Sequence, residues 1–200
     1  MKLHWNPASP FARKCVVCAD EAGVELEIFV RGGTPLLIDN MPVEQNPLGK
    51  IPALERAGGP AIYDSRVITR YIAAQGAGNL YPEARIWEVL TLEATADGIM
   101  EAAVLMVYEG RVRPEDKQYP EWIEAQWLKV SRSLDALEER WMSHLAGPLD
   151  AAQIAVGCAL PYLDFRHGDR DWRAGRPALA AWEAEFAKRE SMTATVPDNL

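Results

Sequence analysis

The sequence predicts a small α/β domain followed by an all-helical domain, and two observations support this fold class. Before residue 80, short apolar runs of strand length alternate with helical patterns, and Pro and Gly are frequent. From Ile86 onward, long helical periods dominate while Gly and Pro become rarer. Strands mixed with helices, followed by helices alone, are typical of two domains. We expect the α/β domain at residues 1–76, a linker at 77–84 and the helical domain at 85–200.

The elements of the first domain follow from apolar spacing and turn residues. Leu3–Trp5 is expected as a strand and Phe11–Ala22 as a helix, because apolar or small residues recur at helical spacing. Gly23 is placed to end that helix. Asp64 or Ser65 is expected to cap a second helix. Three further short strands are expected at 25–30, 52–55 and 61–63, with a Gly-Gly hairpin signal between the last two.

The second domain shows four helical patterns. One row at helical spacing, acidic at two positions, contains Ile86, Leu90, Ala94, Asp97, Glu101, Val104 and Tyr108. A second stripe predicts a single helix and contains Trp127, Val130, Leu134, Leu137 and Trp141. Residues 154–165 are apolar on most sides, which predicts a buried central helix. Pro177 begins a last helix.

Composition and charge exclude several classes of protein. The chain has 200 residues, with 21 basic and 29 acidic side chains and a formal net charge of −8. An acidic chain is a poor candidate for binding a phosphate backbone, so we expect no nucleic-acid partner. No apolar run reaches the roughly 18 residues of a membrane helix, and the first residues lack an apolar signal segment. Three cysteines, an odd number, favour a reducing, cytoplasmic location over a disulfide scaffold.

Ser9 lies where the first strand turns into a helix. The first turn of a helix has free backbone N–H groups and a partial positive charge, so it attracts an anion such as a thiolate. Ser9 presents a hydroxyl to that anion, or it simply caps the helix. Cys15 and Cys18 match a C-x-x-C pattern, but they lie inside the helix, where we expect small buried apolar residues. With Cys158 they lack a fourth ligand of suitable spacing, so no metal site is expected.

The segment Asn46–Leu54 is a more specific signal of a binding site than the segment around Ser9. A proline directly before a strand often marks a tight turn, and a cis bond between Ile51 and Pro52 would turn the Ile51 backbone outward. That backbone would then pair with an extended peptide, whereas the alternative is an ordinary loop with prolines. Asp64 and Ser65 cap the next helix, or they hold the amino and carboxylate groups of a ligand.

Together these segments resemble the cytosolic glutathione transferase superfamily, in particular bacterial members with an active-site serine. The motifs are Ser-Pro-Phe-Ala-Arg-Lys at 9–14, Asn-Pro-Leu-Gly-Lys-Ile-Pro at 46–52 and Asp-Ser at 64–65. The segments 96–102 and 161–166 are also similar to bacterial members, and Asp150 with Gln153 resembles the family's reciprocal helix cap. The resemblance covers nearly the whole chain. It implies a thioredoxin-like α/β N-terminal domain, an all-α C-terminal domain, a glutathione site on the first and a hydrophobic site between them.

The resemblance also implies the role of each site residue. Ser9 is the catalytic residue, whose hydroxyl hydrogen-bonds to the glutathione sulfur. Ile51, before a cis Pro52, binds the cysteinyl backbone. Asp64 and Ser65 hold the γ-glutamyl end, where the family often has Glu or Gln at the first position. The other glutathione-binding residues expected from the resemblance are Phe11, Lys50 and Asp97, the last reaching across a dimer interface in some relatives.

One contact of the family has no obvious counterpart. Many relatives use a Lys or His before the proline-rich loop to meet the glycyl carboxylate, and residues 33–36 contain neither. Arg13 or Lys50 is a candidate substitute. The apolar wall of the second-substrate site is expected to include Trp5, Ala8, Met106 and Tyr108, unless these residues are ordinary core.

The expected function is the transfer of glutathione, as co-substrate, to a hydrophobic electrophile in detoxification. A thiol with a pKa near ~8.5 is mostly protonated at neutral pH, and a helix N-terminus with a hydroxyl donor lowers that pKa. The resemblance further implies a homodimer formed through the helices after Asp64 and Ile86. Two alternatives remain: a non-catalytic interaction protein of the starvation-protein type, and a glutathione-dependent peroxidase or isomerase using the same site.

Overall fold

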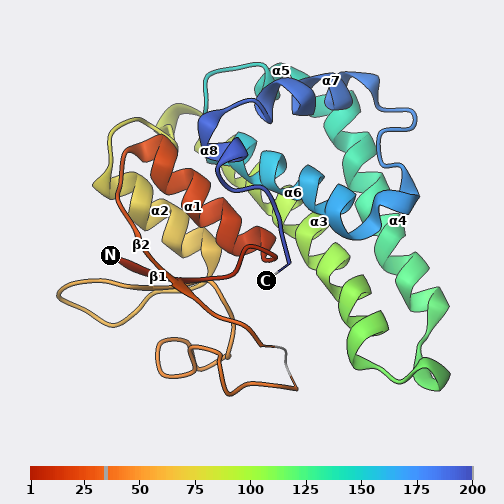
Figure 1. Cartoon of the computed structure of the whole chain (residues 1–200). Helices are drawn as coiled ribbons and strands as arrows, with labels where there is room; N and C mark the ends of the chain where they lie inside the picture. The colour runs from red at the N-terminus through yellow and green to blue at the C-terminus, as the bar shows by residue number, and fades with distance from the viewer. Residues whose placement is uncertain (34–35, 200) are drawn as a thin grey trace. The chain divides into compact units, whose positions relative to one another are not determined.

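The computed structural model describes residues 1–33 and 36–199, which form two compact units, each considered by itself (Figure 1). The first unit consists of Met1–Ile86 together with the residues from Glu190 onward, and the second is Trp87–Arg189. The predicted fold class, an α/β unit and a helical unit, is confirmed. The segment after Arg189, expected in the helical domain, groups with the α/β unit. Within the described ranges, no helix is both long and apolar enough to cross a membrane.

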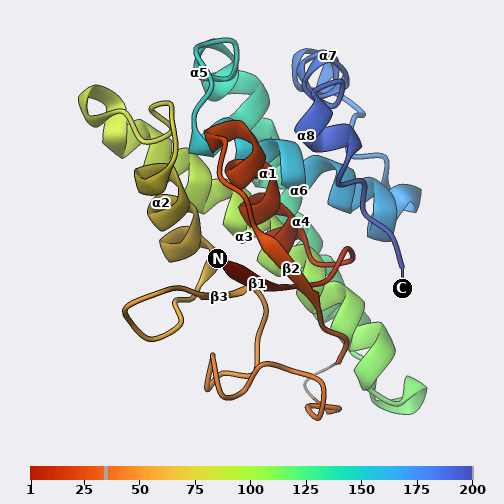
Figure 2. The same ribbon diagram turned by 60° about the vertical axis from the view of Figure 1, so that its left-hand side comes forward.

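The α/β unit contains a three-stranded mixed sheet in the order β2-β1-β3 (Figure 2). These strands are β1 (Lys2–Trp5), β2 (Glu27–Val30) and β3 (Ala53–Glu55). In β1, Leu3 lies opposite Ile28 of the parallel strand β2 and opposite Leu54 of the antiparallel strand β3. A parallel pair requires a crossover connection, which the first helix supplies. The strand expected at 61–63 is reduced to a single bridge between Ile62 and Leu54.

Two helices of this unit, α1 (Pro10–Ala22) and α2 (Ser65–Gln75), lie side by side (Figure 1). As predicted, Gly23 ends α1 in the left-handed conformation, with φ 67°, and its N–H donates to carbonyls of the last turn. Cys15 and Cys18 are fully buried, and each thiol donates to a carbonyl of α2. The expectation that both are small buried core residues is therefore confirmed.

The short helix α8 (Glu190–Thr193) belongs to the same unit and packs on α1. Arg13 in α1 is almost completely buried, with 3% of its surface exposed. Its guanidinium donates to the Met192 carbonyl at 3.0 Å and to the Thr195 hydroxyl at 3.2 Å. A buried guanidinium needs such acceptors, so this segment completes the environment of α1.

The helical unit is built from α3 (Ile86–Val112), α4 (Pro120–Ala136), α5 (Met142–Leu145), α6 (Ala151–His167) and α7 (Pro177–Phe186). Every residue from Ala151 to Leu160 is buried, so the prediction of a buried helix is confirmed. The stripe predicted as a single helix is interrupted: a wider π-helical turn at Leu137–Trp141 separates α4 from α5. On α3, the deeply buried face lies beside the predicted row, at positions such as Leu92, Ala96, Met100 and Ala103.

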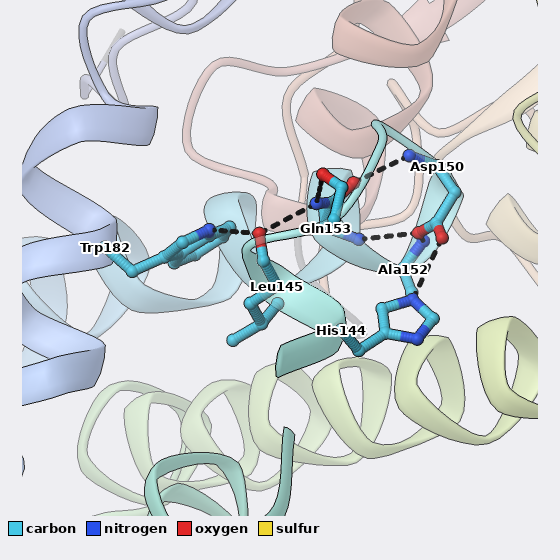
Figure 3. A network of polar contacts seen from close by, with 7 residues as sticks. His144, Leu145, Asp150, Ala152, Gln153 and Trp182 are labelled. Atoms are coloured by element: carbon cyan, nitrogen blue, oxygen red, sulfur yellow. Dashed lines mark hydrogen bonds and ion pairs between the residues drawn. The ribbon is translucent and has the colours of Figure 1, made fainter. Parts of the chain in front are cut away.

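The start of α6 is fixed by a polar network (Figure 3). The Asp150 carboxylate accepts from the N–H groups of Ala152 and Gln153, while the Gln153 side chain accepts from the Asp150 N–H at 2.8 Å. This is the reciprocal cap that the sequence predicts. The structure adds two contacts: Asp150 also meets His144 at 2.9 Å, and the Gln153 amide donates to the Leu145 carbonyl. The cap therefore also holds the preceding turn.

Candidate glutathione site

The loop between β1 and α1 is organised by Asn6, a residue that the sequence analysis did not single out. Its side-chain oxygen accepts from the Ala8 N–H at 2.9 Å, and its backbone carbonyl accepts from the Ser9 N–H at 2.9 Å. Its amide nitrogen donates to the Arg31 carbonyl just after β2. Asn at the start of a loop is a known turn signal, so the residue type at this position already indicated a turn. Asn6 thereby fixes where Ser9 begins the helix.

Ser9 is the N-cap of α1, and its hydroxyl oxygen accepts from the Ala12 N–H at 3.3 Å. Pro10, the first helical residue, has no N–H, and the Arg13 N–H is bonded to the Ser9 carbonyl. Within residues 1–33 and 36–199, no group accepts a hydrogen bond from the Phe11 N–H. The hydroxyl proton of Ser9 and the N–H of Phe11 therefore stand at the positive end of α1, where an anion is stabilised.

The proline-rich segment reaches the same end of the sheet. The Ile51–Pro52 peptide bond is cis. Because His4 pairs with Ala53, Pro52 comes level with Trp5, the last residue of β1. Among the described residues, the Ile51 N–H and carbonyl take part in no hydrogen bond. An extended ligand with one donor and one acceptor can therefore pair with this backbone, as in strand addition.

Asn46 shapes the loop before this segment. It is buried, accepts from the Leu48 N–H at 3.0 Å and donates to the Lys50 carbonyl at 2.9 Å. Gly49 occupies the left-handed region, with φ 60°, where glycine is favoured. Asn46 lies in the quoted motif but was assigned no role, and it is the residue that holds the turn together.

Asp64 and Ser65 stand at the start of α2. The Asp64 carboxylate accepts from the Arg66 N–H at 3.0 Å, and it also pairs with the Arg66 guanidinium at 3.1 Å. Its side chain is 55% exposed, whereas Ser65 is buried. The capping role considered for Asp64 is thus present. The bridge between Leu54 and Ile62 returns the chain toward Pro52, and all three motifs belong to the α/β unit.

The two cations considered for the glycyl carboxylate differ in exposure. Arg13 is buried against the segment after Glu190, and its guanidinium is bonded there. Lys50 is exposed beside the Ile51–Pro52 bond. Of the segment 33–36, Thr34 and Pro35 lie outside the described residues. Of these two cations, Lys50 is therefore the one that is open to solvent.

Asp97 belongs to the other unit and is described separately. It lies on α3 and is buried, with 6% of its surface exposed. The described residues contain no group of three or more His, Cys, Asp or Glu side chains that could hold a metal ion.

Comparisons with known proteins agree with these motifs. The model of the glutathione S-transferase N-terminal domain matches residues 8–75, and that of the C-terminal domain matches residues 120–185. The chain is 34% identical to an uncharacterised GST-like protein, YibF, of Escherichia coli K12, covering 98% of each protein.

Solved structures give the same result. A glutathione transferase family member from Pseudomonas fluorescens Pf-5 with bound glutathione is 44% identical, with a TM-score of 0.96 and 99% coverage of both chains. A structure with bound S-(propanoic acid)-glutathione from the same strain is 43% identical, with a TM-score of 0.91 and complete coverage of both chains. The motif order, the fold and these similarities lead to one conclusion: the chain belongs to the glutathione S-transferase family.

Proposed function

We propose that this protein binds reduced glutathione on its α/β unit and transfers the thiolate to an electrophilic carbon. The observation that carries the proposal is the start of α1, where the Ser9 hydroxyl and the Phe11 N–H are available to one anion. Both are donors, and both lie at the positive end of a helix of 13 residues. Such a site favours a thiolate over a thiol and lowers the thiol pKa.

The other contacts of the tripeptide follow from the same unit. The free backbone of Ile51 pairs with the cysteinyl residue, Asp64 with Ser65 receives the γ-glutamyl amino acid end, and Lys50 receives the glycyl carboxylate. The sulfur then forms a bond to the electrophilic carbon, and the leaving group departs with its electron pair. Ser9 acts as a hydrogen-bond donor to sulfur, not as a nucleophile, because no described side chain accepts its proton as a base.

The comparisons support glutathione as the co-substrate. Two similar structures hold glutathione or S-(propanoic acid)-glutathione, the second a thioether of the kind that this reaction forms. We further propose a cytoplasmic homodimer. Val67 on α2 and Trp87 on α3 are 47% and 76% exposed, which suits helices that pack against a second copy. Asp97 is the residue proposed to act toward the partner's glutathione.

A titration separates the proposal from its alternatives. Reduced glutathione is titrated into the protein at pH 7 by calorimetry, and thiolate absorbance is followed in parallel, with S-methylglutathione as the matched ligand that forms no thiolate. Binding with thiolate absorbance supports the transferase or a peroxidase or isomerase, which a substrate panel then distinguishes. Binding without thiolate contradicts the activation step. Failure to bind either ligand overturns the proposal in favour of a non-catalytic interaction protein.

A further inference from the structure

We infer that the outer edge of β2 is an interaction surface for a second copy of this chain. Two β2 strands pair antiparallel about a two-fold axis at Phe29, which joins the sheets of two copies into one continuous sheet. This surface uses neither of the helices proposed for the homodimer, so a chain that engages both surfaces forms assemblies larger than a dimer. The inference concerns association alone and does not depend on the proposed transferase activity.

The edge of β2 carries backbone groups without partners. β2 is the outer strand of the order β2-β1-β3 (Figure 2). The N–H groups of Glu27 and Arg31 each donate at 2.8 Å to a carbonyl at one end of β1, so every second residue turns its backbone toward β1. The backbone of Ile28 and Val30 therefore points outward, and no group within residues 1–33 and 36–199 bonds to it. Two donors and two acceptors remain available on this edge.

The two edges of the sheet differ. On the β3 side, Leu54 and Ile62 exchange backbone hydrogen bonds of 2.9 and 3.0 Å, so a bridge covers part of that edge. Proteins ordinarily protect an open edge with lysine, proline or a bulge. Residues 27–31 contain neither lysine nor proline, and β2 keeps a regular one-to-one register with β1. The β2 edge is therefore regular enough to accept another strand.

The side chains of β2 suit strand pairing as well. Residues 28–30 are apolar, β-branched or aromatic, and between 38% and 49% of each side chain is exposed. The Phe29 ring is held by its neighbours. It meets the His4 ring edge to face at 5.6 Å, and the Lys2 ammonium and Arg31 guanidinium lie 4.5 and 4.4 Å from its centroid. A ring that is already ordered loses little conformational entropy when a second copy packs against it.

The sequence of β2 is complementary to itself in the antiparallel direction. With Phe29 opposite Phe29, Glu27 of each copy lies opposite Arg31 of the other, and Ile28 lies opposite Val30. Acid therefore meets base at both ends of the paired segment, and apolar side chains meet in its middle. Opposite charges and apolar residues in facing positions both stabilise an antiparallel pair. This charge complementarity identifies the occupant of the edge as a second copy.

The two charged residues are available for this pairing. Neither Glu27 nor Arg31 forms an ion pair within the described part of the chain. The Arg31 Nε donates to His4 Nδ1 at 2.9 Å, which orients the guanidinium and leaves its two terminal nitrogens for a carboxylate. An arginine held in this way can bind a carboxylate with both terminal nitrogens.

The backbone geometry selects the same register. In an antiparallel pair, residues that exchange hydrogen bonds alternate with residues that do not, and side chains come closest at the second kind. The outward backbones of Ile28 and Val30 exchange four hydrogen bonds between the copies. The Phe29 pair and both charged pairs then fall at the close positions. The two neighbouring two-fold registers would instead place Glu27 or Arg31 opposite Phe29, so only this register matches every side chain.

An ordinary solvated edge is the competing explanation. β2 has only 4 residues, and a short edge strand is one device that keeps a sheet from associating. That explanation predicts no preferred contact between particular residues of two copies. An unrelated extended peptide would use the same backbone groups but would not require β2 to match its own charges. Measurements specific to position and charge therefore separate these explanations.

The first test is disulfide cross-linking of Phe29→Cys, Ile28→Cys and Val30→Cys by diamide, which takes up the two electrons and two protons released. The native cysteines are buried and do not compete. Only position 29 faces itself, with Cα atoms about 4.5 Å apart, a distance that a disulfide spans. We expect Phe29→Cys to cross-link at least about 10-fold faster than Ile28→Cys, although the native side chains are 38% and 39% exposed. Equal rates, or faster cross-linking at 28 or 30, would overturn the inference.

The second test exchanges charges. Glu27→Arg and Arg31→Glu each place like charges opposite one another at both ends of the pair, so each variant alone should self-associate roughly 10-fold or more weakly in sedimentation velocity. An equimolar mixture should recover association, because one variant offers only arginine and the other only glutamate at these positions. Glu25→Arg, the same change just before β2, is the control and should associate like the wild type. A mixture that associates no better than either variant refutes the pairing.

A third variant separates this surface from the proposed homodimer. Val30→Pro removes an outward N–H and no hydrogen bond to β1, so the fold should persist, which circular dichroism checks. Sedimentation of wild type and Val30→Pro is compared from micromolar to millimolar concentration. We expect the wild type alone to add the larger species, while any helix-mediated dimer remains in both. Identical masses throughout would overturn the inference, and glutathione titration of the same samples reports the proposed function independently.

Discussion

The hydroxyl oxygen of Ser9 accepts a hydrogen bond from the backbone N–H of Ala12 at 3.3 Å. This contact caps α1 through an oxygen lone pair and leaves the hydroxyl proton available. One side chain therefore begins the helix and presents a donor at its positive end. The two roles have different energetic consequences, which substitution can separate.

Ser9→Gly and Ser9→Ala should both lower kcat/KM for conjugation by about 10- to 100-fold, because losing the donor raises the thiol pKa of bound glutathione by about one to two units. Glutathione affinity should change little. Their stabilities should differ: glycine costs a few tenths of a kcal/mol at an N-cap, whereas alanine costs about 1 kcal/mol. Turnover at pH 7 and urea unfolding measure both effects. Wild-type turnover in either variant would remove Ser9 from catalysis.

Asp64→Asn should weaken glutathione binding by roughly 10-fold or more, because a charged hydrogen bond contributes about 1.5–3 kcal/mol. The asparagine oxygen can still accept from the Arg66 N–H, so unfolding free energy should change by less than about 0.5 kcal/mol. Calorimetric titration with glutathione measures the change in binding affinity. Cysteinylglycine, which lacks the γ-glutamyl group, is the control ligand and should bind both proteins equally. A similar loss for both ligands would contradict the assignment of Asp64.

Asp150→Ala should lower the free energy of unfolding by about 2–3 kcal/mol, since it removes the cap of α6 and the contact with His144. Asp150→Ser keeps a capping oxygen and should cost clearly less. Urea denaturation midpoints compare the two variants. If serine were as damaging as alanine, the cap would not be the source of the effect.

His167 should make stability depend on pH. Burial lowers the pKa of His167 below its usual value of about 6.5, so the unfolded chain binds the proton more readily than the folded one. Well above pH 6.5, the His167 imidazole is neutral in both the folded and the unfolded state, so it does not make the free energy of unfolding depend on pH. As the pH falls below 6.5, wild-type stability should decline relative to His167→Gln, by at most about 1.4 kcal/mol per pH unit. Unfolding curves between pH 8 and 5 measure this difference in stability. If the wild-type protein became more stable than His167→Gln as the pH falls, the prediction would be contradicted.

Local signals predicted much of this structure. Gly23, Asp64 and the pair Asp150 and Gln153 act on neighbours within a few residues, so their roles as helix ends and caps could be inferred from the sequence. The motifs around Ser9 and Pro52 indicated a family, and the family supplied the fold that the comparisons confirm.

Features that depend on distant partners could not be predicted in this way. The strand expected at 61–63 forms only the bridge between Ile62 and Leu54. A short apolar run in the sequence does not show how many residue pairs it forms with a neighbouring strand. The π-helical turn at Leu137–Trp141 continues the same apolar stripe, so periodicity does not detect it. Arg13 resembles a surface cation in sequence, and its acceptors lie about 180 positions later in the chain.

That separation has a consequence for biosynthesis. A ribosome adds about 5–20 residues per second, so α1 emerges roughly 10–40 s before the segment that receives the Arg13 guanidinium. Until then this buried cation lacks its final acceptors, and the α/β unit, although encoded first, is completed last. The order of translation therefore delivers every residue of the helical unit before the last residues of the α/β unit.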